Sequence, residues 1–269
     1  MSEGVTHRIP GRNVEIAATE YPGGGPRVVL VHGIGSSGAA WNNVISDLAK
    51  NFTPITIDQR GHGESGHPDH GYLYADYIGD LEAVLDYFEM DRPLIVGHSL
   101  GGIVALWWAA RHPDRAAALV IEDSPLRSGE SFRSAFEGWL ELNTLSENDA
   151  AEQYRGENPQ WSDDLIRLRA HQITSTSRGV FSELFADSMA HEGVNRIDEI
   201  AGIGSPILLI HGDIDAGGMV EPDDAKELKS RLANVELAHL PGANHRIHAE
   251  RADEFVALTT DFLRKHAQQ

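Results

Sequence analysis

A serine stands between two glycines at a point where the chain is expected to turn sharply. Residues 97–101 read Gly-His-Ser-Leu-Gly, after a short apolar run at 94–96 and before an alanine-rich segment at 103–112. A strand that turns directly into a helix strains the residue at the turn, and glycines two positions before and after it provide the room. Such a turn would expose the hydroxyl of Ser99 at the end of the strand, next to the positive end of the helix, where it could act as a nucleophile. Taken alone, the pattern also fits an ordinary serine in a glycine-rich turn.

The elements that would carry this turn alternate between strands and helices. Apolar runs predict strands at 13–21, 27–31, 53–57, 94–96, 117–122, 206–210 and 235–240. Amphipathic or alanine-rich segments predict helices at 40–48, 76–90, 103–112, 222–232 and 249–266. This alternation predicts a doubly wound parallel sheet with right-handed crossovers, in which ligands bind beyond the carboxyl ends of the strands. Polar, glycine-containing motifs follow the strands at these ends.

The segment 126–195 interrupts this alternation. It contains no run typical of a buried strand and mixes helix-forming residues with charges and aromatics. We therefore expect a helical cap at 126–195, inserted into an α/β core made of residues 1–125 and 196–269. Most of the cap aromatics are expected to pack the cap against the core, and a minority to line a pocket. They are Phe132, Phe136, Trp139, Tyr154, Trp161, Phe181 and Phe185.

The composition narrows the class of protein. The chain has 269 residues, enough for one large α/β domain with an insertion, and no Cys, which excludes disulfides and a thiol nucleophile. We expect no secretory signal, because the first residues lack a basic segment followed by an apolar one, and no membrane span. A net charge of −19 repels nucleic acid and anionic membranes and favours a neutral or cationic small substrate. Together these features predict a cytoplasmic protein.

Four motifs together give a resemblance to a known family. They are His-Gly-Ile-Gly at 32–35, Asp-Gln-Arg-Gly-His-Gly-Glu-Ser at 58–65, Gly-His-Ser-Leu-Gly-Gly at 97–102 and Gly-Ala-Asn-His at 242–245. In their order and spacing the chain resembles serine hydrolases of the α/β-hydrolase fold, of the cap-bearing esterase and lactonase type. The resemblance implies a mostly parallel, twisted eight-stranded sheet flanked by helices, with the helical cap inserted after strand six. It also implies a catalytic triad in the order Ser, Asp, His.

The resemblance assigns roles to particular residues of this chain. Ser99 would be the nucleophile and His245 its general base, with His248 as a nearby alternative. An oxyanion hole needs two fixed N–H donors, which the resemblance places on the backbone of Ile34 and Leu100.

The acid of the triad stays open between two carboxylates. Asp215 follows the strand predicted at 206–210, which is the commoner position in the family. Asp123 follows the strand before the cap, 24 residues after Ser99, where some cap-bearing esterases and lactonases take their acid. The loop at 216–220 is longer and richer in glycine than is usual for the family, which favours Asp123.

The implied activity is hydrolysis of small to medium carboxylic esters through an acyl-enzyme intermediate. A lactonase or enol-lactonase, or a carbon–carbon bond hydrolase, would use the same triad. A non-catalytic small-molecule receptor could share the fold, and turnover of an ester would distinguish it from an enzyme. The resemblance implies no cofactor and no metal. The expected partner is a small ester or lactone, and the expected state is a monomer or a small homo-oligomer.

Overall fold

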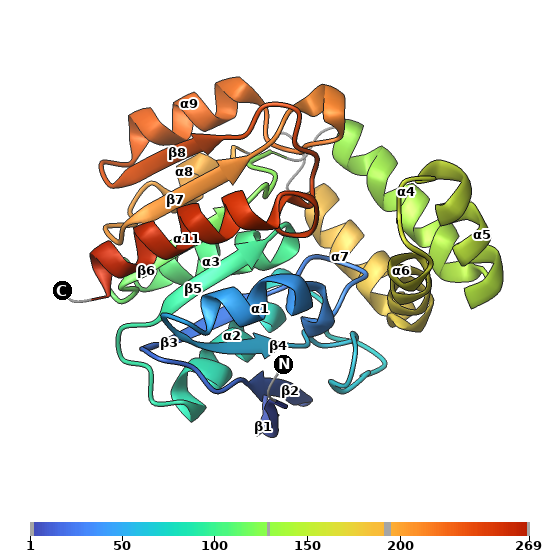
Figure 1. The fold of residues 1–269 in the computed structure, drawn as a ribbon, viewed down its shortest axis with the longest axis horizontal. Coiled ribbons are helices and arrows are strands. Elements are labelled where there is room, and N and C mark those ends of the chain that lie inside the picture. The colour runs from blue at the N-terminus through green and yellow to red at the C-terminus, as the bar shows by residue number, and fades with distance from the viewer. Residues whose placement is uncertain (1–2, 128–129, 191–194, 268–269) are drawn as a thin grey trace.

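The structure is a computed structural model that describes residues 3–127, 130–190 and 195–267. These residues form an eight-stranded sheet in the order β1-β2-β4-β3-β5-β6-β7-β8 (Figure 1). The strands are β1 (Val5–Pro10), β2 (Glu15–Glu20), β3 (Arg27–Val31), β4 (Thr53–Ile57), β5 (Leu94–His98), β6 (Ala118–Glu122), β7 (Ile207–His211) and β8 (Val235–His239). β2 is antiparallel to β1 and β4, whereas all other neighbouring strands are parallel. The predicted eight-stranded, mostly parallel sheet is thus confirmed.

Helices cover both faces of the sheet, because each buried strand sends alternate side chains into two cores. In β3, Val29 and Val31 enter one core, and Val28 and Leu30 enter the other. The helices and 3-10 turns of this part are η1 (Gly38–Trp41), α1 (Asn42–Leu48), α2 (Tyr74–Tyr87), α3 (Leu100–Arg111), α8 (Arg196–Ile200), η2 (Ile214–Ala216), α9 (Pro222–Arg231), α10 (Ile247–Glu250) and α11 (Ala252–His266). α1 packs against α11 on one face, and α3 packs against α2 and α8 on the other (Figure 1).

Among the described residues, four helices lie between β6 and α8, beyond the carboxyl ends of the parallel strands (Figure 1). They are α4 (Glu130–Thr144), α5 (Glu147–Glu157), α6 (Asp163–Ser175) and α7 (Arg178–Ala190). An isolated antiparallel bridge between Arg127 and Asn195 joins the two ends of this segment. The helices fall inside the predicted cap at 126–195, and the division of the chain into a core and a cap domain stays a prediction. In the described part of the chain, no helix combines the length and the apolarity that crossing a membrane requires.

Some elements differ from the sequence-based expectation. β1 and α8 were not predicted. β1 is an edge strand in which Ile9 is the single buried residue, so it lacks the apolar alternation that marks a half-buried strand. The helix expected at 40–48 begins as the 3-10 turn η1, and the one expected at 249–266 is divided at Arg251 into α10 and α11.

Candidate active site

Ser99 occupies a strained turn between β5 and α3. Its backbone has φ 53° and ψ −117°, a conformation that side-chain-bearing residues rarely adopt. The turn is close-packed: a Cβ atom at Gly97 would lie 2.5 Å from the carbonyl oxygen of Gly101, and one at Gly101 would lie 2.2 Å from that of Val31. The two glycines flanking Ser99 are therefore required by space. The backbone N–H of Ser99 donates to the carbonyl of Glu122 at 3.0 Å, which ties the turn to the next strand.

Asp123 and His245 form a hydrogen-bonded pair. Nδ1 of His245 lies 2.7 Å from Oδ2 of Asp123, whose side chain is completely buried at the end of β6. The same oxygen accepts the backbone N–H of Met219 at 2.8 Å. Because an ionised carboxylate can only accept, Nδ1 of His245 must carry the proton, and Nε2 is left as the basic nitrogen of the ring. His245 and Ser99 line the same cavity.

The other candidate acid, Asp215, lies apart from this pair. It is exposed on η2, and in the described part of the chain the carboxylate that meets the ring of His245 is that of Asp123. The glycine-rich loop that follows Asp215 supplies the Met219 N–H to Asp123. The geometry therefore gathers Ser99, Asp123 and His245 and leaves Asp215 outside.

The two candidate oxyanion donors lie next to Ser99. Leu100 is the first residue of α3, so its N–H has no acceptor within the helix. Ile34 and Leu100 both line the small space beside Ser99. A Cβ at Gly33 would lie 3.1 Å from the Cβ of Ser99, so the chain just before Ile34 runs directly against the nucleophile turn.

Two buried histidines hold the Ile34 loop in place. Nε2 of His62 accepts the N–H of Gly35 at 3.1 Å, and Nε2 of His32 accepts the N–H of Gln59 at 3.0 Å. Burial lowers the pKa of His62 to about 3 and that of His32 to about 4. Both rings are therefore neutral near pH 7 and can serve as acceptors.

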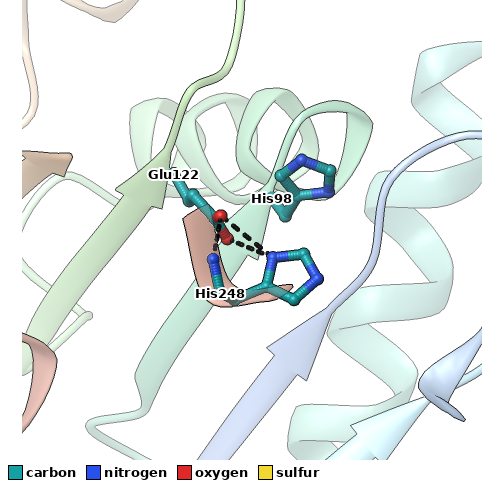
Figure 2. A group of neighbouring side chains, drawn as sticks. All are labelled: His98, Glu122 and His248. Carbon is teal, nitrogen blue, oxygen red and sulfur yellow. Dashed lines mark hydrogen bonds and ion pairs between the residues drawn. The ribbon is translucent and has the colours of Figure 1, made fainter. Parts of the chain in front are cut away.

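Glu122 and His248 form a second hydrogen-bonded pair, which Figure 2 shows together with His98. Nδ1 of His248 lies 2.9 and 2.8 Å from the two carboxylate oxygens of Glu122, and its backbone N–H donates to Glu122 at 2.8 Å. His98 donates from Nε2 to the carbonyl of His245 at 2.9 Å. His248, the local alternative for the base, is thus bound to the residue that precedes Asp123.

His98, Glu122 and His248 could together bind a metal ion by residue type, since their ligand atoms lie within 4.8 Å of one another. However, Glu122 and Nδ1 of His248 are already satisfied by each other, and Nε2 of His98 by a backbone carbonyl. Burial, together with the neighbouring His245 and His248, lowers the pKa of His98 well below its usual value. We interpret the cluster as a hydrogen-bonded support for the loop that carries His245.

A cavity of about 540 Å³ opens above Ser99, between the core loops and the cap. Of the predicted cap aromatics, Trp139, Tyr154 and Trp161 line it. The others that can be placed pack inside the protein. Phe136 and Phe181 are buried, Phe185 packs on Phe136 with ring centroids 5.3 Å apart, and Phe132 lies outside the residues whose side chains are described.

Sequence reasoning missed the charged residues that line this cavity, among them Arg169 on α6 and Arg246. Arg246 follows His245 directly, and this adjacency was the one signal that could have drawn attention to it. Glu122 and Met219, which support His248 and Asp123, were missed as well.

Comparison with known proteins agrees with the fold. Residues 28–258 match the family described as the alpha/beta hydrolase family. The 2-(acetamidomethylene)succinate hydrolase of Mesorhizobium japonicum is 26% identical over 262 residues, which cover 90% of this chain and 89% of that protein. The N-formylmaleamate deformylase of Pseudomonas putida is 29% identical over 249 residues, 90% of each chain. The crystal structure of E-2-(acetamidomethylene)succinate hydrolase has the same fold, with a TM-score of 0.82 at 23% identity over 97% of this chain and 99% of that one.

Proposed function

The chain belongs to the alpha/beta hydrolase family, and from this premise we propose that it is a serine hydrolase that cleaves carboxylic esters through an acyl-enzyme intermediate. Ser99 is the nucleophile, His245 the general base and Asp123 the acid that orients the base. The observation that carries the proposal is the 2.7 Å pair of His245 and the buried Asp123, beside a serine held in a strained turn. Strain of this kind persists where surrounding structure enforces it, and it concentrates at functional sites.

The chemistry follows from the positions of these groups. Nε2 of His245 removes the proton of Ser99 as Oγ attacks the ester carbonyl, and Asp123 stabilises the imidazolium that forms. The backbone N–H groups of Leu100 and Ile34 hold the oxyanion of the tetrahedral intermediate. His245 then gives the proton to the departing alcohol. In the second half of the reaction, water attacks the acyl carbonyl as His245 takes its proton, and the proton passes to Oγ of Ser99 as the carboxylic acid leaves. No step requires a cofactor.

A second candidate is hydrolysis of an N-acyl bond on the same triad. It is favoured by the names of two relatives, an N-formylmaleamate deformylase and a 2-(acetamidomethylene)succinate hydrolase. A lactone would be opened by the same attack of Ser99, and the open-chain product would stay attached until water arrives. Ester, lactone and N-acyl substrates therefore belong in one activity screen.

The decisive variant is Ser99→Ala, because alanine occupies the same turn without an attacking oxygen. We expect a loss of at least about 10³-fold in kcat, as found for triad nucleophiles, without loss of folding. A fluorophosphonate should label Ser99 in the natural protein and leave Ser99→Ala unlabelled, which peptide mass spectrometry reads directly. Retention of more than about a tenth of kcat by the variant would refute the assignment. If the chain were a non-catalytic receptor instead, it would bind the esters without hydrolysing them.

A further inference from the structure

Two arginines line the cavity. Arg169 extends from α6 of the cap, and Arg246 follows His245 in the core. Arg169 donates from Nη1 to the amide oxygen of Gln172 at 2.8 Å, while its Nε is buried with no acceptor among the described residues. The guanidinium of Arg246 lies over the ring of Trp161, 4.2 Å from its centroid. Across residues 3–127, 130–190 and 195–267, neither guanidinium forms an ion pair with a carboxylate.

The neighbouring polar groups add a further donor. The indole N–H of Trp161, which also lines the cavity, is buried with no acceptor in the described part of the chain. Gln172 has its oxygen occupied by Arg169 and its amide nitrogen donating to Ser37 at 2.8 Å. A buried donor without an acceptor is costly, and guanidinium and indole groups can only donate. This wall of the cavity therefore has an excess of donors, which an acceptor such as a carboxylate would satisfy.

The charges of the residues that line the cavity also favour the binding of an anion. Burial, and then the positive charge of Arg169, lower the pKa of Arg246 to about 9, which still leaves Arg246 charged at neutral pH, while Tyr154, Glu250 and Glu122 act in the opposite direction. Two carboxylates also line the cavity, Glu157 and Glu250, but both are exposed to solvent. Glu250 is engaged by the side chain of Asn244 at 2.5 Å. An anion that reaches the arginines would offset the repulsion between the two guanidinium groups by forming charged hydrogen bonds with them.

We propose that Arg169 and Arg246 form a carboxylate-binding subsite, so that the preferred substrate carries a carboxylate away from the bond that Ser99 attacks. The inference rests on the proposed function for the identity of the reacting group. It departs from the expectation of a neutral or cationic substrate, which was drawn from the net charge of −19. Net charge describes the field around the whole molecule, whereas two arginines inside the cavity determine the potential that a bound substrate meets.

The kinetic test compares substrates that differ in one charge. The 4-nitrophenyl monoesters of glutaric, adipic and suberic acids would be assayed beside the same compounds with the free carboxyl methylated. We expect kcat/KM to be roughly 10- to 100-fold higher for the best acid than for its methyl ester, the range of a hydrogen bond to a charged group. Arg169→Gln and Arg246→Lys should each reduce this ratio at least severalfold. Arg167→Gln is the matched control, because Arg167 lies on the same helix, is exposed and pairs with Asp164, and it should leave the ratio unchanged.

A binding test without turnover separates the two proposals. In Ser99→Ala protein, adipate should bind measurably by calorimetry, dimethyl adipate should bind at least tenfold more weakly, and adding Arg169→Gln should remove the difference. If wild-type protein cleaves none of the esters but Ser99→Ala binds adipate through the arginines, the subsite stands and the ester-hydrolase proposal fails. If the esters are cleaved without preference for the acid and adipate does not bind, the subsite is refuted and the hydrolase stands.

A stability measurement guards against misfolding as the cause. Because Arg169→Gln removes one of two like charges inside the cavity, its melting temperature should be equal to or above that of the natural protein. A variant that melts at a higher temperature and has lost the preference for acids would support the proposal, because residues of binding sites often lower the stability of the free protein. A lowered melting temperature together with an unchanged acid preference would show that Arg169 is structural and would overturn the proposal.

Discussion

Exchange of each candidate acid for its amide tests the triad most directly. Oδ2 of Asp123 accepts two donors, Nδ1 of His245 at 2.7 Å and the N–H of Met219 at 2.8 Å, while Oδ1 is buried without a partner in the described part of the chain. In Asp123→Asn, an amide nitrogen at the place of Oδ2 would confront two donors. With the amide oxygen at that place, the NH₂ group fills the site of Oδ1, where it finds no acceptor.

Both orientations have a cost that can be estimated. A buried donor without an acceptor costs roughly 1–3 kcal/mol, so Asp123→Asn should lower the free energy of unfolding by that amount. The effect on catalysis is larger, because the neutral amide cannot stabilise the imidazolium of His245 and can favour the wrong tautomer. We expect kcat to fall by roughly 10²- to 10⁴-fold, as when the orienting acid of a triad is lost.

Asp215→Asn is the matched control. Asp215 is exposed on η2, and the carboxylate at His245 is that of Asp123, so kcat of Asp215→Asn should stay within about threefold of wild type. Substitutions at exposed sites change the free energy of unfolding by less than about 0.5 kcal/mol. Both variants would be assayed on the substrate that wild type cleaves fastest, with urea unfolding measured on the same preparations. A crippled Asp215→Asn beside an active Asp123→Asn would refute the assignment of the acid. Equal losses in both would refute the reasoning that one carboxylate orients His245 alone.

Two further predictions concern the supports of the site. His248→Ala leaves Glu122 buried without its imidazole partner, so urea unfolding should show a loss of roughly 1–3 kcal/mol in the free energy of unfolding, and an unchanged midpoint would contradict this. His32 has its pKa lowered from 6.5 to about 4, so as pH falls the unfolded chain binds protons first. The contribution of His32 to the free energy of unfolding is therefore complete above about pH 6.5 and decreases by about 3 kcal/mol as the pH falls from 6.5 to about 4. A free energy of unfolding that is constant over this range would contradict the burial argument.

The turn at Ser99 could be predicted from sequence because its close packing requires particular residues there. Gly97 and Gly101 have no room for a Cβ, so the pattern around Ser99 records a backbone requirement that is local in the chain. The same holds for the strands of the parallel sheet, whose continuous apolar runs follow from burial on both faces. The edge strand β1 was missed because most of its side chains are exposed and carry no such pattern.

The choice of the acid and the charge of the cavity could not be derived in this way. Asp123 and Asp215 each follow a strand of the sheet, and only the course of the loops decides which carboxylate reaches His245. Arg169 and Arg246 are far apart in the chain, and their approach depends on how α6 docks above the core. Such contacts arise from tertiary packing, so a single sequence gives the residue types but not which residues become neighbours in the fold.

Strand register explains how the sheet could place all three proposed triad members together. His98 and Glu122 are directly paired on β5 and β6, so the residues that follow them, Ser99 and Asp123, leave neighbouring strands at the same level. Both bend away with positive φ, 53° and 42°, a strain of roughly 1–3 kcal/mol each.

The loop of His245 is fastened to this same pair of residues. Glu122 binds the side chain and the backbone N–H of His248, and His98 donates to the carbonyl of His245. The paired residues His98 and Glu122 therefore directly precede Ser99 and Asp123 in the chain and also hold the loop that carries His245. A change at Glu122 or His98 should therefore disturb the positions of Ser99, Asp123 and His245 together, although Asp123 and His245 are also joined directly by their hydrogen bond of 2.7 Å.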